Sequence, residues 1–484
     1  MGKIIKRIPY KGVLIELKNI VLHSSMQNIE LPTNTLKSIL YCGATVEYQC
    51  GRITEEQYFA RLASDFRHPQ EEIKKAILAV RKSLCVNPKV VEALASMKAK
   101  SKGLFELYAV TNFSKEDYAL VKFLGFDWSL FERVFVSSDI GMQKPELRFY
   151  QHVLNQIGLS SEQVILVDDD TSNLLAAMSM GMQGVMPSDY SLYRSILNFV
   201  DIDPIGRGTR YLHENAQKHH SFTHTGVPVK ENFTQLLILE LTGDRSLIDI
   251  GSHRTTWNLF IVTPVLTQAD FPDDMDTTSL GITILNRPTH VANLVMDKML
   301  QYRTSDGLMQ TFFTDFKKRV DPIVCCNILN IFYQYGWGNE LSETFDWVYQ
   351  VLQTRTYIHG SAFYPLPEAF FFFLSRMMLR LKNHRPCVYI RMRGLLIKRL
   401  EERLSVPVDA ASLAMRLIVC HQVGVRHVSG LKFLLSMQEP DGGWEIGTLY
   451  QYYSKRLWLG NRGTSTALAL DAIRRCQPWL AHRF

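Results

Sequence analysis

The sequence pattern changes completely at about residue 232, and this change constrains the fold more than any other feature. From Gly12 to about Pro187, short apolar runs such as GVLIEL, LYAVTN and QVILVDD alternate with amphipathic helical stretches. From Asn232 to Phe484, long segments with apolar residues at helical spacing follow one another, with few strand signals. Buried strands alternating with helices are typical of a doubly wound parallel sheet, and long helical segments alone are typical of an all-α domain. The chain is therefore predicted to join an α/β domain to an all-α domain.

The predicted organisation has three parts. Residues 1–187 form the α/β domain, residues 188–231 a polar linker, and residues 232–484 the all-α domain. Within the first domain, residues from about 31 to 99 interrupt the alternation with several helical segments, as an inserted helical cap would. Caps of this kind lie over the carboxyl ends of the strands, where open sheets bind ligands. The linker contains three histidines that are expected to be solvated, because no acidic or cysteine partner accompanies them: His219, His220 and His224.

Charge and cysteine content narrow the function classes. The chain carries 54 Lys and Arg against 47 Asp and Glu, a formal net charge of +7. The basic residues are not clustered, so no nucleic-acid partner is expected, while the basic excess suits a small anionic substrate. The eight cysteines show no CxxC pair and no metal-ligand spacing with histidine, which predicts reduced thiols and a cytoplasmic location. No apolar run reaches the length that spans a bilayer, so stable membrane insertion is not expected.

Four polar pieces of the first domain each follow a predicted strand. In chain order they are Glu16 and Lys18 in LIELKNI, Thr111 in AVTNFS, Lys144 in GMQKPELRFY, and Asp168, Asp169 and Asp170 in VILVDDDTSN. Their order and spacing resemble the four motifs of the haloacid-dehalogenase superfamily. The resemblance implies a haloacid-dehalogenase-like doubly wound sheet, in which Thr111 would hydrogen-bond a phosphoryl group.

The first of these motifs departs from the family pattern. Family members carry two aspartates one residue apart, the first attacking phosphorus and the second acting as acid and base, whereas Glu16 and Lys18 stand here. The extra methylene of Glu16 displaces the attacking oxygen by about a bond length, and a misplacement of roughly 1 Å costs on the order of 100-fold in rate. Lys18 also places a positive charge near the usual Mg²⁺ position. The domain is therefore predicted to be a silent scaffold, with residual hydrolysis as the alternative. The acidic run 168–170 could then serve only as a helix N-cap cluster, with Lys144 as its partner.

The segment FPDDMDTTSLGI, residues 271–282, concentrates acids and threonines. It resembles the D-x-D-T-T acid motif of class II terpene cyclases, which protonate a terminal alkene or epoxide, and the matching residues are Asp274, Asp276, Thr277 and Thr278. An alkene is a very weak base, so its donor must be a carboxylic acid kept neutral despite a free pKa of about 3.9, in a cavity that excludes water. A second carboxylate and apolar walls favour that neutral form. The resemblance implies that Asp276 donates the proton, that Asp274 polarises or orients it, and that both threonines supply neutral hydroxyls. The alternative is a solvated helix N-terminus.

Further segments of the second domain point the same way. MQEPDGGW, residues 437–444, resembles the QW motif of class II cyclases, which braces helices, through Gln438, Asp441, Gly442, Gly443 and Trp444. The domain is also rich in aromatic residues, whose ring faces stabilise cations without acting as nucleophiles. The segments 359–376 and 458–473 resemble fungal drimane-type sesquiterpene cyclases, which join a dehalogenase-like domain to a class II cyclase domain. The resemblance covers nearly the whole chain and implies an α/α barrel for the second domain.

The resemblance implies a reaction and its ligands. Farnesyl diphosphate would be protonated at its distal alkene and closed to drimenyl or albicanyl diphosphate, and the altered first motif argues that the diphosphate is retained for a separate downstream phosphatase. Mg²⁺ is expected to share the diphosphate charge. The candidate diphosphate-binding residues are Lys455, Arg456 and Arg462, and the candidate Mg²⁺ ligands are Glu240 and Asp244. A homodimer is compatible with both domain types.

Other readings stay open on the sequence alone. A bifunctional enzyme would release drimenol or albicanol, and a prenyl phosphate phosphatase would use the second domain only to bind its substrate. A class I synthase, which ionises the diphosphate, would need a D-D-x-x-D/E cluster, and the spacing of Asp273, Asp274 and Asp276 does not match it. A non-catalytic isoprenoid-binding protein would give Asp276 no role.

Overall fold

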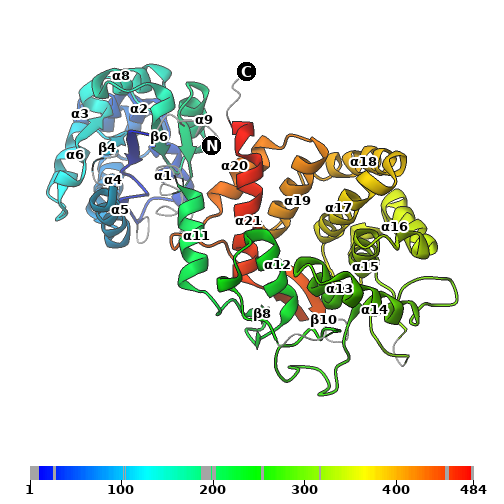
Figure 1. Ribbon diagram of the computed structural model, residues 1–484. Helices are drawn as coiled ribbons and strands as arrows, with labels where there is room; N and C mark the ends of the chain where they lie inside the picture. Colours follow the sequence, from blue (N-terminus) through cyan, green and yellow to red (C-terminus); the bar gives the residue numbers. More distant parts are fainter. Residues whose placement is uncertain are drawn as a thin grey trace. The chain divides into compact units, whose positions relative to one another are not determined.

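The chain divides into two compact units, Met1–Ile202 and Asp203–Phe484 (Figure 1). The computed structural model describes the following residues: 10–25, 29–101, 103, 105–186, 198, 203–251, 255–315, 318–452 and 457–480.

The first unit is built on a five-stranded parallel sheet with the order β5-β4-β1-β6-β7. Its strands are β1 (Gly12–Glu16), β4 (Glu106–Thr111), β5 (Arg133–Val136), β6 (Val164–Val167) and β7 (Gln183–Val185). All five residues of the central strand β1 are buried. Val13 and Ile15 enter one hydrophobic core and Leu14 enters the other, as the two-residue period of a strand requires. The doubly wound sheet predicted from the sequence is confirmed.

A helical cap with its own small core follows β1. Its helices are α1 (Thr33–Leu40), α2 (Gly43–Gln49), α3 (Glu55–Phe66) and α4 (Gln70–Lys82). The next helix, α5 (Pro88–Ser101), lies outside the cap, because Leu94 and Met97 pack into a core of the sheet. The predicted cap at 31–99 therefore extends too far at its carboxyl end. The remaining helices beside the sheet include α6 (Lys115–Lys122), α8 (Leu147–Ile157) and α9 (Thr171–Ser179).

Residues 203–231, predicted as linker, belong to the second unit instead. They form α11 (Pro204–Glu214), β8 (Ser221–Thr223) and β9 (Pro228–Val229). The two strands join β10 (Thr448–Tyr452) and β11 (Leu457–Gly460) in a four-stranded sheet. His219 is buried, with a ring nitrogen 3.0 Å from the carbonyl oxygen of Leu212, so the expectation that it is solvated is wrong. A linker was predicted because this segment is rich in polar residues. Many of them lie on the solvent-facing side of the strongly amphipathic helix α11.

The second unit is an α/α barrel. Six helices pack in a closed ring in the order α12-α13-α15-α17-α19-α21 and back to α12. They are α12 (Asn232–Thr242), α13 (Met275–Ile284), α15 (Pro322–Gln334), α17 (Pro367–His384), α19 (Ala410–Val423) and α21 (Arg462–Cys476). Outside this ring pack α11, α16 (Ser342–Thr354), α18 (Pro386–Glu401) and α20 (Val428–Ser436). A further helix, α14 (Thr289–Leu300), contributes side chains to the same hydrophobic core. Figure 1 shows the inner and outer helices side by side from green to red. The predicted all-α second domain is confirmed.

The QW segment contacts the outer helices of this barrel. Gln438 accepts a hydrogen bond from Arg207 of α11 at 2.5 Å and donates to the carbonyl oxygens of Pro204 and Gly442. The indole of Trp444 is fully buried, and its N–H donates to the carbonyl oxygen of Leu434 in α20 at 2.8 Å. The backbone N–H of Trp444 also donates to the Thr466 hydroxyl of the inner helix α21 at 3.1 Å, so the segment contacts inner and outer helices. The bracing role that the resemblance implies stays a prediction.

Trp444→Ala is expected to destabilise the second unit by about 3–5 kcal/mol, because it empties a large buried site and removes a hydrogen bond. Calorimetry of the full chain measures this as a lowered transition temperature of the second unit. Trp458→Ala is the matched control, since the Trp458 side chain is half exposed, and its effect is expected to stay within about 1 kcal/mol. Equal effects of the two substitutions would contradict the bracing role.

Among the described residues, no helix combines the length and apolar composition needed to cross a membrane.

Candidate active site

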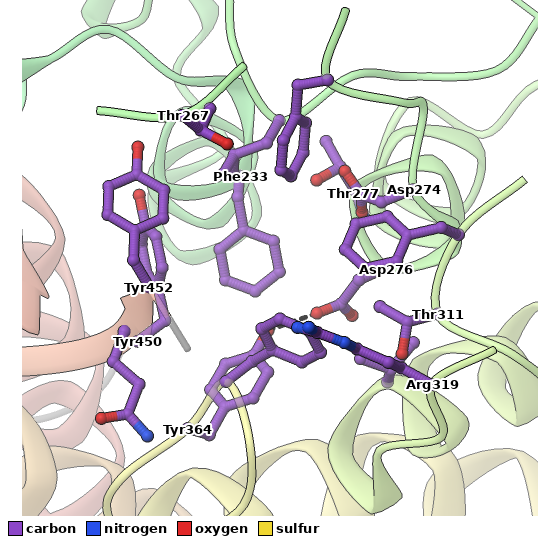
Figure 2. Close-up of a pocket in the computed structure, with 16 residues that line it drawn as sticks. Phe233, Thr267, Asp274, Asp276, Thr277, Thr311, Arg319, Tyr364, Tyr450 and Tyr452 are labelled. Carbon is purple, nitrogen blue, oxygen red and sulfur yellow. Dashed lines mark hydrogen bonds between the residues drawn. The ribbon is translucent and has the colours of Figure 1, made fainter. Parts of the chain in front are cut away.

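A cavity lies in the second unit, beside the amino-terminal ends of α12, α13 and α15. Aromatic side chains form much of its wall, including Phe233, Phe271, Phe312, Phe363, Tyr450 and Tyr452 (Figure 2). Edge-to-face contacts hold several of these rings, such as Phe271 against Phe312 and Phe312 against Phe363. The cavity therefore has ring faces that can stabilise a cation, beside polar side chains such as Thr267, Thr311 and Gln451.

Asp276 lies in the first turn of α13 and lines this cavity. One carboxylate oxygen, Oδ1, accepts a hydrogen bond from the Asn327 amide at 2.7 Å, and the other accepts one from the Tyr364 hydroxyl. Burial raises the pKa of Asp276 to about 6, although both hydrogen bonds favour the charged form. The carboxyl group is thus held in one orientation with a weakened acidity.

Asp274 is the N-cap of α13 and lies beside Asp276 in the cavity wall. Its Oδ1 accepts a hydrogen bond from the backbone N–H of Thr277 at 2.6 Å, while its Oδ2 is buried without a hydrogen-bond partner among the described residues. Burial, followed by the charge of Asp276, raises the pKa of Asp274 well above its usual range. Two adjacent buried carboxyls cannot both ionise at low cost, so the pair retains a proton. The alternative of a solvated helix N-terminus does not hold, because both side chains are buried.

The two threonines of the motif have different positions. Thr277 lines the cavity. Thr278 points away toward the backbone of Trp257, whose N–H donates to the Thr278 hydroxyl at 2.8 Å. The extended segment through Trp257 pairs with Asp274, so Thr278 helps hold the start of α13 in place. Only one of the two predicted hydroxyls therefore faces the site.

A polar chain behind Asp276 was missed by the sequence reasoning. Arg376 of α17 donates to the Oδ1 atom of Asn327 at 2.7 Å and pairs with Glu240 at 2.7 Å. A guanidinium only donates, so Arg376 turns the amide oxygen of Asn327 toward itself and the amide nitrogen toward Asp276. The sequence signal for this role was weak, because the apolar helix α15 carries two asparagines, Asn327 and Asn330, and nothing local separates them.

Asp321 ties these groups together. Its Oδ1 caps α15, the helix of Asn327, through the N–H of Ile323 at 2.9 Å. Its Oδ2 accepts a hydrogen bond from the N–H of Phe363 at 3.3 Å, which holds the loop that carries Tyr364. One buried carboxyl thus positions both donors to Asp276.

The predicted Mg²⁺ ligands do not lie at the cavity. Glu240 is engaged by Arg376, and Asp244 caps a short 3-10 helix, η3 (Arg245–Leu247), by accepting from Ser246. Neither lines the cavity, so their proposed role as metal ligands is not supported by their contacts. Within the described parts of the chain, no three His, Cys, Asp or Glu side chains are grouped to hold a metal ion.

None of the three predicted diphosphate-binding residues is found to line the cavity among the described residues. Lys455 and Arg456 lie outside the described residues. Arg462 forms a two-pronged ion pair with Asp441 of the QW segment and covers the Tyr211 ring, so it braces the fold rather than lining the cavity. A different cation, Arg319, lines the cavity and was not predicted (Figure 2).

In the first unit, the degenerate phosphatase residues gather at the carboxyl ends of neighbouring strands. The buried ammonium of Lys144 lies between the carboxylates of Glu16, at the end of β1, and Asp168, after β6, at 2.5 Å from the latter. Thr111 ends β4, and its buried hydroxyl has no partner among the described residues. The sequence analysis placed each of these pieces after a predicted strand, and their role at a degenerate phosphatase site stays a prediction.

The other members of this set point elsewhere. Asp169 accepts a hydrogen bond from Asn19 at 2.9 Å, and Asp170 caps α9 through the N–H of Ser172. Lys18 lines a second cavity together with cap residues such as Tyr48 and Arg81. Burial lowers the pKa of Lys18. The helix-cap role thus applies to Asp170, whereas Asp168 belongs to the cluster around Lys144.

Comparison with known proteins matches both units. Residues 205–335 match the sesquiterpene cyclase astC-like C-terminal domain, and residues 15–181 match the haloacid dehalogenase-like hydrolases. Drimenol cyclase drtB of Aspergillus calidoustus is 36% identical over 465 residues, covering 96% of this chain and 88% of that protein. Sesquiterpene phosphatase astK of Aspergillus oryzae is 25% identical over 181 residues, covering 37% of this chain and 91% of that protein.

Among solved structures, the type II terpene cyclase MstE from Scytonema, in complex with geranylgeranyl dihydroxybenzoate, matches with a TM-score of 0.44 at 12% identity. The match covers 59% of this chain and 99% of the MstE chain. The match to the drimenol cyclase runs through both units at more than a third identity, and it confirms the family predicted from the sequence. The chain therefore belongs to the sesquiterpene cyclases that join a haloacid-dehalogenase-like domain to a class II terpene cyclase domain.

Proposed function

We propose that this enzyme protonates farnesyl diphosphate at its distal alkene, closes two rings, and yields a bicyclic drimane-type diphosphate with the diphosphate retained. The observation that carries the proposal is the pair of buried carboxyls, Asp274 and Asp276, in the wall of an aromatic cavity. The similarity to a protein named drimenol cyclase supports the drimane skeleton. The two candidate products are drimenyl diphosphate and albicanyl diphosphate. They differ only in which proton is lost in the last step.

The first step uses the proton held by the carboxyl pair. Asp276 donates it to the distal alkene, and the electron pair of that double bond forms the new C–H bond. The resulting cation is attacked by the next double bond in turn, which closes the rings. Tyr364 and Asn327 hold the carboxylate that Asp276 becomes, so charge is stabilised on the donor as it forms. Apolar walls keep water away from the cation until the last step.

The diphosphate requires positive charge at the cavity. Arg319 is the described cation there and is our candidate for the diphosphate contact. The described cavity residues include no metal-ligand set apart from Asp274 and Asp276, which must keep a proton and therefore cannot serve as ligands. We propose that Mg²⁺ accompanies the substrate as a counter-ion of the diphosphate, and no step is assigned to it.

Retention of the diphosphate rests on the first unit. Both carboxylates that would hold a metal there, Glu16 and Asp168, are bound to the Lys144 ammonium. Lys18, at the acid–base position, lines a different cavity under the cap. The second candidate function is a bifunctional enzyme that releases the alcohol, and the alcohol in the name of the drimenol cyclase relative favours it.

Product analysis distinguishes these functions. Purified protein is incubated with farnesyl diphosphate and Mg²⁺, with and without added alkaline phosphatase, and extracts are examined by mass spectrometry. A bicyclic alcohol that appears only after phosphatase treatment supports the cyclase with retained diphosphate. The same alcohol without phosphatase supports the bifunctional enzyme, and farnesol alone contradicts a cyclase.

The cyclisation rate is expected to fall as the pH rises. Burial raises the pKa of Asp276 to about 6, and only the protonated form can donate. A plot of kcat against pH should therefore be flat at low pH and fall about tenfold per unit above the apparent pKa of the carboxyl pair. A rate that rises with pH across this range would contradict an acid-started reaction.

Asn327→Leu is expected to move this profile and lower its plateau. Loss of the amide removes a hydrogen bond that favours the Asp276 carboxylate, so the apparent pKa should shift upward. The plateau value of kcat should fall about 10- to 100-fold, because a donor that stabilises the developing charge is lost. Asn330→Leu, on the same helix and hydrogen-bonded to Arg380 rather than to Asp276, is the matched control. A plateau loss without any shift in the profile would mean that Asn327 only supports the fold.

A further inference from the structure

Two buried tyrosine hydroxyls in the cavity wall form no hydrogen bond of good geometry with the described residues. They belong to Tyr450 and Tyr452 of β10, whose side chains are more than nine-tenths buried. In Figure 2 these tyrosines lie on the far side of Phe233 from Asp276. A buried hydroxyl without a well-formed hydrogen bond is costly, so the cavity has two under-satisfied polar groups at the end opposite the acid.

A buried carboxylate lies behind Tyr450. Glu231 is almost fully buried, and its Oε1 accepts a hydrogen bond from the Ser221 hydroxyl at 2.6 Å. Ser221 and the charge of Glu231 both act on the Tyr450 hydroxyl, and burial raises the pKa of that phenol well above its usual range. The order from the cavity inward is therefore Tyr450, Ser221, Glu231.

The cap of α12 does not require a charged side chain at position 231. The Oε2 atom of Glu231 caps α12 by accepting from the N–H of Thr234 at 2.9 Å, a task that a serine or threonine could perform without a charge. The hydrogen bonds to Glu231 come from neutral groups among the described residues, namely the hydroxyls of Ser221 and Thr234 and backbone N–H groups. A carboxylate buried without a cation is expensive, and burial raises the pKa of Glu231, which makes it a better proton acceptor.

The reaction proposed above needs such an acceptor. Ring closure ends in a tertiary cation, which must lose a proton from a neighbouring carbon. After donation, Asp276 is on the opposite side of the cavity with both oxygens held by Asn327 and Tyr364. Hydrogens next to a cationic carbon are very acidic, so a phenol oxygen can accept one if its own proton can move on.

We infer that Tyr450, backed by Ser221 and Glu231, takes the proton that ends the reaction, an inference that rests on the proposed cyclase function. The C–H electron pair becomes the new carbon–carbon double bond, and the proton joins the Tyr450 oxygen. The phenol proton passes to Ser221, and the Ser221 proton passes to the Glu231 carboxylate. Asp276 ends as a carboxylate and Glu231 as a neutral acid, and both exchange protons with water after product release. Tyr450 is the catalytic residue, and Ser221 and Glu231 are positioning residues that act through it.

Product ratios test this directly, because they do not depend on the amount of folded enzyme. Tyr450→Phe and Glu231→Gln are each expected to lower the ratio of the main alkene product to all other cyclised products at least fivefold. Double-bond isomers and hydrated drimane-type diphosphates should increase. The amide oxygen of the glutamine can still accept the hydrogen bond that caps α12, so the loss is specific to the basic carboxylate.

Tyr357→Phe is the matched control, since Tyr357 is a buried tyrosine with an unpartnered hydroxyl away from the cavity. Its products should match those of the parent enzyme. If Tyr450→Phe and Glu231→Gln slow the reaction but leave the product ratio unchanged, the relay is wrong. A shift on Tyr452→Phe with none on Tyr450→Phe overturns the choice of tyrosine. Failure of the unsubstituted enzyme to make any bicyclic product would instead reject the proposed function, and the relay with it.

Discussion

Asp276→Asn is expected to lower the rate of cyclisation by about 1,000-fold or more, to the limit of detection. General acid catalysis contributes about 10²- to 10⁴-fold, and an amide has no proton acidic enough to transfer to an alkene. Asparagine has nearly the same shape, so the surrounding groups Asn327 and Tyr364 keep a partner and the barrel should remain folded. Mass-spectrometric quantification of bicyclic product per mole of enzyme measures the loss.

Asp273→Asn is the matched control within the same acidic segment. Asp273 accepts a hydrogen bond from Thr256 at 2.6 Å and does not line the cavity. Its activity should stay within about threefold of the parent, because surface-type substitutions away from the site have small effects. Retention of more than a tenth of the rate by Asp276→Asn, or equal losses in both variants, would show that Asp276 is not the donor.

The second large effect is a gain. The double substitution Glu16→Asp with Lys18→Asp is expected to raise Mg²⁺-dependent phosphate release at least about 100-fold, as the shorter side chain brings the attacking oxygen back by a bond length. It also supplies an acid–base group and removes a positive charge. Lys144, Thr111 and Asp168 already stand at the same edge of the sheet. Release of p-nitrophenol from p-nitrophenyl phosphate measures the change.

The same double variant with Lys144→Met provides the control for this gain. Lys144 is the cation between the two carboxylates, so its loss should remove the new activity. A parent enzyme that already hydrolyses the phosphate at the rate of the double variant would contradict a silent first unit. The alcohol-releasing function would then replace diphosphate retention.

The groups that the sequence revealed are those that lie close together along the chain. Asp274 and Asp276 are two residues apart on one helix turn, and the strand-end residues of the first unit follow a fixed order on one sheet edge. Tyr364 and Asn327 reach Asp276 from 88 and 51 residues away, so no local pattern links them to it. Their roles come from the closed ring of helices, which brings α15 and the loop before α17 against α13.

The wrong predictions for ligand-binding residues have a common cause. They concern charged side chains whose ion-pair partners lie far away in the sequence. Arg462 was assigned to the diphosphate, yet it pairs with Asp441 of the QW segment, 21 residues earlier in the chain. Glu240 was assigned to Mg²⁺, yet its partner Arg376 lies 136 residues away. A charged side chain near a motif carries no information on its partner until the fold is known, and Arg319 shows the converse, because nothing local marked it as a cavity residue.

Whether Asp276 starts the reaction by protonation is tested most directly by running it in D₂O. Enzyme equilibrated in D₂O is incubated with farnesyl diphosphate and Mg²⁺, and the product is examined by mass spectrometry with its diphosphate intact. A donated proton predicts a bicyclic diphosphate with one non-exchangeable deuterium, on the ring carbon formed from the distal alkene. A product without deuterium, accompanied by free inorganic diphosphate, would mean that the reaction starts by ionisation and would contradict the role of Asp276.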